Sequence, residues 1–142
     1  MTAMPKPLPI ANAETRPYWE GAKAHQLLIQ KCSSCGHMQF YPRLICSACS
    51  ARGVEWHAAS GRGTVKSFTI IRRAVSAAFE ADVPYVVALV ALEEGPTMMS
   101  NIVECEVERV HIGMAVSVTF EQRAIDADAA FVVVPQFRPS AA

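Results

Sequence analysis

The chain has little charge, and the charges that it has cancel. Charged residues make up 18% of the sequence, with 13 basic residues against 13 acidic ones, whereas about 25% is typical of a soluble domain. Domains that bind nucleic acid are usually clearly basic, so this balance argues against a nucleic-acid-binding protein. Part of the apolar fraction of 51% is alanine. Because soluble monomers rarely expose large apolar patches, the low fraction of charged residues indicates that a partner covers part of the surface.

The sequence also lacks a long apolar run and a secretion signal. Its longest apolar stretch, residues 83–92, is far shorter than the ~20 residues that span a bilayer. The first residues, MTAMPKPLPIANAE, contain three prolines and no apolar segment of the kind that directs secretion. We therefore expect a cytoplasmic protein with no membrane contact. Thiols stay reduced in that compartment, so paired cysteines favour a metal ion over a disulfide.

Patterns of common catalytic sites are missing as well. The chain has no phosphate-binding loop, nucleophile elbow or dinucleotide fingerprint. Its four histidines, at positions 25, 37, 57 and 111, do not have the spacing of a catalytic pair or triad. Glu93 and Glu94 fall in a predicted turn, where carboxylates are normally solvated. We therefore predict no catalytic residue in this chain.

Four of the five cysteines form two C-x₂-C pairs, at positions 32, 35, 46 and 49. In each pair a tight turn can present both sulfurs to one ion, and Gly36 follows the first pair, where the backbone must turn sharply. Two such pairs facing each other give the tetrahedral four-sulfur shell that zinc prefers. Because protein atoms fill all four positions, we predict a structural Zn²⁺ site. Iron, which also accepts four thiolates, is the alternative metal.

Cys105 is left outside this motif. Free cysteines are usually small apolar core residues. Its neighbours Glu104 and Glu106 disfavour the thiolate that a nucleophile needs. We therefore assign Cys105 to the core.

The first third of the chain predicts a helix followed by a small ribbon. Thr15 and Pro17 are typical of a helix start, and Tyr18 and Trp19 would lie on one side of this helix. These two rings either form a small core cluster or anchor a partner, since Trp and Tyr are enriched at binding hot spots. Short apolar segments at residues 25–31, 38–41 and 54–57 suit a ribbon that needs metal to fold.

The rest of the chain predicts a barrel. Strands are expected over residues 64–73, 85–92, 97–103, 115–121 and 131–138, with no sustained helix. The nearly continuous apolar run 85–92 is typical of a strand buried on both faces. Five strands of this size favour a barrel of the OB type over a small sandwich. The fold class is thus mainly β, and we expect three units: a tail with a docking helix and strand (1–30), a rubredoxin-like zinc ribbon (31–57) and an OB-fold barrel (58–142).

Three stretches carry a resemblance to a known family: CSSCGHMQFYPRLICSAC, VPYVVALVALEEG and HIGMAVSVTF. Together with the aromatic helix before them, they resemble the zinc-ribbon plus OB-fold family of formerly unknown function that accompanies acyl-CoA enzymes. The resemblance covers residues 14–138. It implies that the four cysteines are the zinc ligands and that no catalytic residue lies in this chain.

The resemblance also implies a role. Members look like non-catalytic accessory subunits that bind a thiolase-fold enzyme and help to form or close its acyl-CoA site. Such enzymes catalyse acyl transfer, condensation or retro-aldol cleavage of CoA thioesters. The implied partners are thus a thiolase-like enzyme subunit and acyl-CoA at the shared site.

Seven residues are candidates for contacting the partner or acyl-CoA. Arginine suits phosphate through its planar guanidinium, although arginines at a strand end are often only solvated. The candidates are Tyr18, Trp19, Arg43, Phe68, Arg72, Arg73 and Phe79.

The alternative function is a nucleic-acid-binding module, in which barrel aromatics stack on bases.

Overall fold

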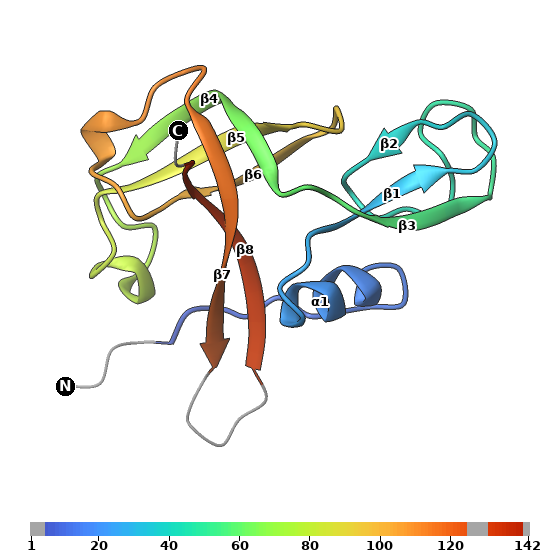
Figure 1. Cartoon of the computed structure of the whole chain (residues 1–142). Helices are drawn as coiled ribbons and strands as arrows, with labels where there is room; N and C mark the ends of the chain where they lie inside the picture. Colours follow the sequence, from blue (N-terminus) through green and yellow to red (C-terminus); the bar gives the residue numbers. More distant parts are fainter. Residues whose placement is uncertain (1–4, 125–130, 141–142) are drawn as a thin grey trace.

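The structure, a computed structural model, describes residues 5–124 and 131–140 and is mainly β, as predicted. A short helix leads into a three-stranded sheet, which is followed by a closed five-stranded barrel (Figure 1). Residues 1–4, 125–130 and 141–142 of the predicted units lie outside the described part. The helix and the sheet comprise α1 (Arg16–Lys23), β1 (Leu28–Cys32), β2 (Met38–Gln39) and β3 (Val54–Ala58). The remaining elements are β4 (Arg62–Ile71), η1 (Ala77–Phe79), β5 (Tyr85–Leu92), β6 (Thr97–Ile102), η2 (Val107–Arg109), β7 (Ala115–Ala124) and β8 (Phe131–Pro139).

Helix α1 begins after Thr15, as predicted, and ends in a turn that separates it from strand β1. His25 has a positive φ of 58°, and its amide donates to the carbonyl of Ala22 at 2.9 Å. The amide of Gln26 donates to the carbonyl of Gly21 at 2.8 Å. These two bonds form a Schellman motif, with His25 at the left-handed position that glycine usually takes. The strand expected from residue 25 therefore begins at Leu28.

Gly21 lets the strand approach the helix closely. A Cβ atom at this position would lie 2.7 Å from two carbon atoms of the Leu28 side chain. Glycine weakens a helix by about 1 kcal/mol relative to alanine. Gly21 is nevertheless present in this helix of eight residues because a larger side chain would clash with Leu28.

The barrel has the strand order β4-β5-β6-β8-β7 and closes from β7 back to β4. All neighbours are antiparallel except β6 and β8, which meet in parallel at Ile102 and Phe137. Five strands in a closed barrel fit the predicted OB type and not the alternative sandwich. No helix in the described residues has the length and hydropathy needed to cross a bilayer.

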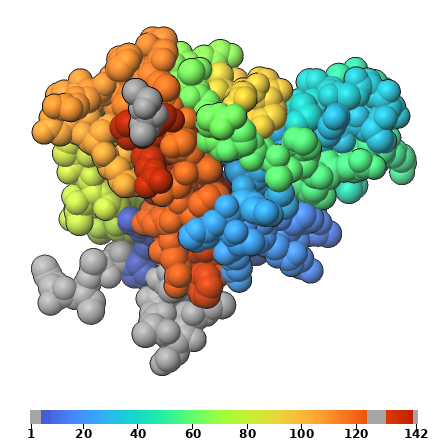
Figure 2. Space-filling model, in the orientation of Figure 1, coloured from blue at the N-terminus to red at the C-terminus, as the bar shows by residue number. Residues whose placement is uncertain are grey.

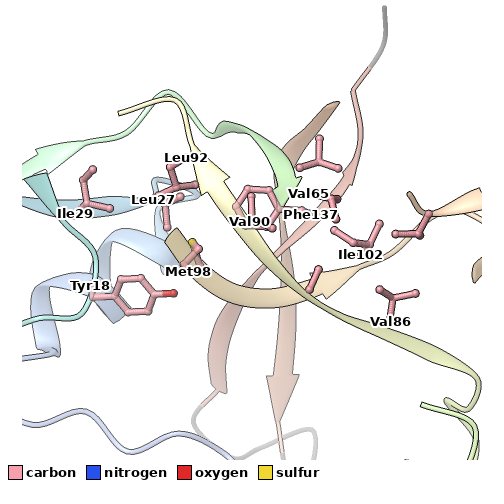
Figure 3. Close-up of a cluster of buried hydrophobic side chains, with 13 residues drawn as sticks. Tyr18, Leu27, Ile29, Val65, Val86, Val90, Leu92, Met98, Ile102 and Phe137 are labelled. Atoms are coloured by element: carbon pink, nitrogen blue, oxygen red, sulfur yellow. The ribbon is translucent and has the colours of Figure 1, made fainter. Parts of the chain in front are cut away.

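One apolar core joins the helix, the root of the ribbon and the barrel. Tyr18, Leu27 and Ile29 belong to the same buried cluster as Leu92 and Met98 of the barrel (Figure 3). Tyr18 packs edge-on against Trp19, with ring centroids 4.8 Å apart. The ribbon is therefore fixed to the barrel by shared side-chain packing at its root.

Strand β5 is buried on one face only, which differs from the expectation of two buried faces. Val86 and Val90 point into the core with no exposed surface, whereas Leu89 on the opposite face is exposed and pairs with Met99 of β6, which is 67% exposed. A closed barrel covers only its inner face, so the outer face of β5 stays partly accessible, with Leu89 as its exposed residue.

The turn carboxylates clamp the junction between ribbon and barrel, instead of being only solvated. Glu94 accepts a hydrogen bond from the amide of Ser60 at 2.7 Å. Glu93 accepts hydrogen bonds from Arg62 at 2.7 and 3.2 Å and from the hydroxyl of Ser60 at 3.1 Å. The bond from Arg62 and then that from Ser60 lower the pKa of the Glu93 carboxyl.

Candidate metal centre

The four paired cysteines converge at one end of the ribbon. Their sulfur atoms all lie within 4.8 Å of one another, with 3.6 Å between Cys32 and Cys49 and 3.7 Å between Cys35 and Cys46. A tetrahedral zinc site with bonds of about 2.3 Å has sulfur–sulfur edges of about 3.8 Å. The sulfurs are therefore already spaced for a tetrahedral ion of this size.

The two C-x₂-C turns repeat the same backbone pattern. The amide of Gly36 donates to the carbonyl of Cys32 at 2.9 Å, and the amide of Ser50 donates to the carbonyl of Cys46 at 3.0 Å. Both residues after a pair have a positive φ, 77° for Gly36 and 65° for Ser50. The sequence predicted both turns and the glycine after the first pair, whereas the positive φ of Ser50 in the second turn was not expected.

Backbone amides point at the first sulfur of each pair. The amide of Ser34 lies 3.4 Å from Cys32 Sγ, and that of Ala48 lies 3.3 Å from Cys46 Sγ. Amide hydrogen bonds, above all the one from Cys35, lower the pKa of Cys32 to about 6. Such donors stabilise a thiolate, the form that binds metal.

The pKa of Cys49, the second cysteine of the second pair, shifts in the opposite direction. An amide hydrogen bond from Ala51 favours its thiolate, but the neighbouring thiols, together with burial, raise the pKa of Cys49 to about 12. Four thiolates this close repel one another, and a bound cation removes that repulsion. The donor set and its spacing thus fit a dication such as Zn²⁺, which would hold the two turns together and leave no ligand position open.

The histidines are not arranged as a catalytic group in the described residues. His25 stacks on Phe120, with centroids 5.0 Å apart, and His111 contacts the carbonyl of Arg109. His37 Nε2 lies 3.3 Å from Ser47 Oγ, which bridges the two cysteine turns. A serine–histidine nucleophile also needs a group that orients the histidine, and no hydrogen bond in the described residues joins a carboxylate to His37.

Cys105 is half-buried and packs against the core, as predicted. Burial is the main cause that raises the pKa of its thiol, and Glu106 adds to this effect. A thiol with a raised pKa carries little thiolate at neutral pH.

The predicted aromatic contacts do not form one site. Tyr18 is buried in the core, where burial raises the pKa of its hydroxyl, and Trp19 and Phe68 pack half-buried against the same core. Phe79 lies on η1, with its ring centroid 6.2 Å from that of Tyr85. Trp19 is thus on the helix, while Phe68 and Phe79 are on the barrel.

The three predicted arginines are exposed, with Arg43 in the ribbon and Arg72 and Arg73 next to each other on the barrel. Arg43 lies in the ribbon, with its guanidinium carbon 5.8 Å from the centroid of the Tyr41 ring. Arg72 lies 3.8 Å from the carboxylate of Glu108, and Arg73 follows it after the end of β4. Their exposure leaves all three open to a partner.

The sequence did not reveal a cavity of about 420 Å³ at one end of the barrel. Phe79, Tyr85 and Ile102 form an apolar wall of this cavity. The basic residues Lys6 and Arg123 line it as well. Lys6 pairs with Asp82 at 2.7 Å, and Arg123 pairs with Glu121 at 3.2 Å. Only the fold brings Lys6, from the N-terminal segment, to this end of the barrel.

Two family models match consecutive parts of the chain. Residues 19–55 match the model described as "ChsH2, rubredoxin-like zinc ribbon domain". Residues 56–121 match the model described as "ChsH2, C-terminal OB-fold domain". The two matches meet inside β3, and the ribbon match identifies the metal of the four-cysteine site as zinc.

Two named relatives and one solved structure are similar to this chain over most of its length. A "DUF35 domain-containing scaffold protein" of Pyrococcus furiosus is 36% identical over 138 residues, which are 96% of each chain. A "Probable enoyl-CoA hydratase alpha subunit" of Thermomonospora curvata is 33% identical over 95% of this chain, which spans only 40% of that longer protein. A chain in the solved structure "Ltp2-ChsH2(DUF35) aldolase" is 32% identical with a TM-score of 0.79, over 93% of this chain and 98% of that chain.

Proposed function

We propose that this chain, which belongs to the DUF35 family of zinc-ribbon and OB-fold proteins, is a non-catalytic accessory subunit of an acyl-CoA-processing enzyme. It would bind a thiolase-fold enzyme and help to form or close the acyl-CoA site of that enzyme. The enzyme subunit would supply the catalytic residues for acyl transfer, condensation or retro-aldol cleavage of a CoA thioester.

The observation that carries this proposal is the likeness to the chain in the aldolase structure. It extends over nearly the whole length of both chains, with a TM-score of 0.79 and 32% identity, so it includes the ribbon, the barrel and the way they are joined. The name of that structure joins two proteins, and the Pyrococcus furiosus relative is named a scaffold protein. Both names suit a chain that works beside an enzyme.

Two features of the chain support the same role. The metal site uses all four ligand positions for cysteine and so holds structure without offering a place for substrate. The outer face of β5 and β6 leaves Leu89 and Met99 exposed, and uncovered apolar surface of this kind favours a protein partner. The predicted contacts that we assign to interfaces with the enzyme or acyl-CoA are Trp19, Arg43, Phe68, Arg72, Arg73 and Phe79, with the buried Tyr18 positioning Trp19.

Reconstitution tests the proposal. The zinc-loaded chain and the thiolase-fold enzyme from the same cells are assayed with acyl-CoA, each alone and then mixed. We expect no turnover by the chain alone and a clear gain in the turnover of the enzyme when the chain is added. Turnover of an acyl-CoA by the purified chain alone would contradict the proposal, as would an enzyme whose rate is unchanged by the chain.

A further inference from the structure

The ribbon carries a five-residue segment, residues 41–45, whose large apolar side chains point to solvent; we name it the ribbon loop. Tyr41 is 64% exposed, Leu44 is 69% exposed and Ile45 is 43% exposed. Single exposed apolar residues are common on protein surfaces, but contiguous groups of them mark interaction sites. The ribbon forms a lobe at the side of the barrel (Figure 2), so its loop is open to a partner.

Two buried glutamines hold the backbone of the ribbon loop. Gln30 is 4% exposed; its amide group donates to the carbonyl of Arg43 and accepts from the amide of Arg43, both at 2.9 Å. Gln39 is 6% exposed; it donates to Gln30 Oε1 at 2.8 Å and to the carbonyl of Ile45 at 3.3 Å. It also accepts a bond from the amide of Ser47 at 2.9 Å. Gln30 therefore bonds mainly to the ribbon loop, whereas Gln39 joins the loop to Gln30 and to Ser47.

These hydrogen bonds hold the ribbon loop in a conformation that leaves its apolar side chains exposed to water. Buried amide groups are costly unless they are hydrogen-bonded, and here they are bonded to a backbone whose apolar side chains stay in water. Pro42, between Tyr41 and Arg43, points inward and is buried. A segment that is ordered before binding loses less conformational entropy when it binds. A rigid loop with outward apolar side chains is thus suited to docking.

The charge of the ribbon loop indicates the chemistry of its partner. From Cys32 to Val54 the charged residues outside the metal site are Arg43 and Arg52, and there is no Asp or Glu. Arg43 lies beside the Tyr41 ring, and its guanidinium can bind a carboxylate in a bidentate way. Two arginines neutralise few phosphates, whereas nucleic-acid binding depends on many such contacts. Three apolar side chains beside one arginine fit a protein surface better.

We propose that the ribbon loop docks into an apolar recess with an acidic rim on the enzyme subunit. This inference rests on the proposed function and names one surface through which the chain would bind the enzyme. Leu44 and Ile45 would enter the recess, Arg43 would pair with a carboxylate at its rim, and Gln30 and Gln39 would act as positioning residues.

The test compares charge-introducing variants at two exposed apolar positions. Leu44→Asp alters the ribbon loop, and Ile112→Asp alters the barrel, where Ile112 is 68% exposed. Each zinc-loaded variant is titrated against the enzyme subunit that co-purifies with the parent chain, after its zinc content and melting temperature are matched to the parent. We expect at least a hundredfold weaker binding for Leu44→Asp and an unchanged Kd for Ile112→Asp. Arg43→Glu should weaken binding at least tenfold, because it places a carboxylate against the acidic rim.

Two further results separate the steps of the inference. Gln39→Ala keeps every exposed side chain of the loop, so a variant that retains zinc but binds about tenfold more weakly supports the positioning role. If Leu44→Asp and Arg43→Glu bind the enzyme as tightly as the parent, the docking surface lies elsewhere and this inference is overturned, while the proposed function stands. If the parent binds no thiolase-fold enzyme but binds an oligonucleotide, both fail together.

Discussion

The ribbon and the barrel hold their strands together in different ways. The barrel is filled with apolar side chains, and Val65, Val90 and Phe137 have almost no exposed surface. Beyond its root, the buried side chains of the ribbon are two of the four cysteines, Pro42 and the amide-bearing Gln30 and Gln39. A sheet with two strands of five residues and one of two is too small to bury a core of its own. The difference shows that the metal does in the ribbon what hydrophobic burial does in the barrel.

Loss of zinc should have the largest effect, and it should fall on the ribbon. Zinc binding supplies about 10–16 kcal/mol in small zinc domains, so Cys32→Ser should lower the zinc content from one per chain to near zero. Amide exchange should then become fast over residues 28–58 and stay slow in the barrel strands. Cys105→Ser, at a cysteine outside the site, is the matched control and should keep its zinc. A Cys32→Ser protein that binds zinc and melts like the parent would disprove the ligand assignment.

Truncation of the barrel core should have the next largest effect and should leave the zinc bound. Phe137 has no exposed surface and joins β8 to both β6 and β7. Replacing a buried phenylalanine with alanine costs about 3–5 kcal/mol, so Phe137→Ala should lower the free energy of unfolding by that amount in urea denaturation. Phe131→Ala, at a residue that is 38% exposed, serves as control and should change it little. Loss of zinc in Phe137→Ala at native conditions would show that the two regions are not separable in this way.

A glycine in the second cysteine turn should stabilise the ribbon. Ser50 has a φ of 65°, a conformation that costs a residue with a side chain about 1–2 kcal/mol. Ser50→Gly should therefore raise the stability of the ribbon by about 1 kcal/mol, measured as resistance of the zinc complex to a competing chelator. Ser34→Gly, in the first turn, should give no such gain, because positive φ is found there at Gly36 instead. Equal effects of both substitutions would argue against relief of strain at Ser50.

The clamp at the junction should give the smallest effect, and this effect should depend on pH. Arg62 and Ser60 lower the pKa of Glu93, so the folded state favours the ionised carboxylate. The resulting stability is fully present above the ordinary glutamate pKa and is lost as the pH falls through the lowered value. Glu93→Gln should therefore lower the melting temperature slightly at pH 7, and the difference from the parent should shrink in acid. A difference that is constant from pH 7 to pH 3 would show that the charge of Glu93 does not stabilise the junction.

The sequence predicted the metal site and the fold class because both depend on local signals. Paired cysteines fix four ligands by spacing alone, and alternating or continuous apolar residues marked all five barrel strands. The clamp of Glu93 on Arg62 could not be predicted, since 31 residues separate them and only barrel closure brings them together. The single buried face of β5 was missed because an apolar run does not show whether its second face is covered by the same chain or by another one.

The role of the glutamines in the ribbon was likewise hidden. Gln30 and Gln39 are polar residues in strands, where a sequence pattern places them on the solvent side. Their burial follows from the path of the ribbon loop, which brings the backbone of Arg43 and Ile45 over the sheet. Such non-local backbone contacts leave no spacing that a sequence pattern can detect.

The most direct test of the accessory-subunit role is native mass spectrometry of the protein purified, with whatever accompanies it, from its own cells. We predict a complex that contains a thiolase-like chain and one zinc ion per copy of this protein. A zinc-loaded chain with no protein partner, under conditions that preserve other complexes from the same cells, would contradict the role.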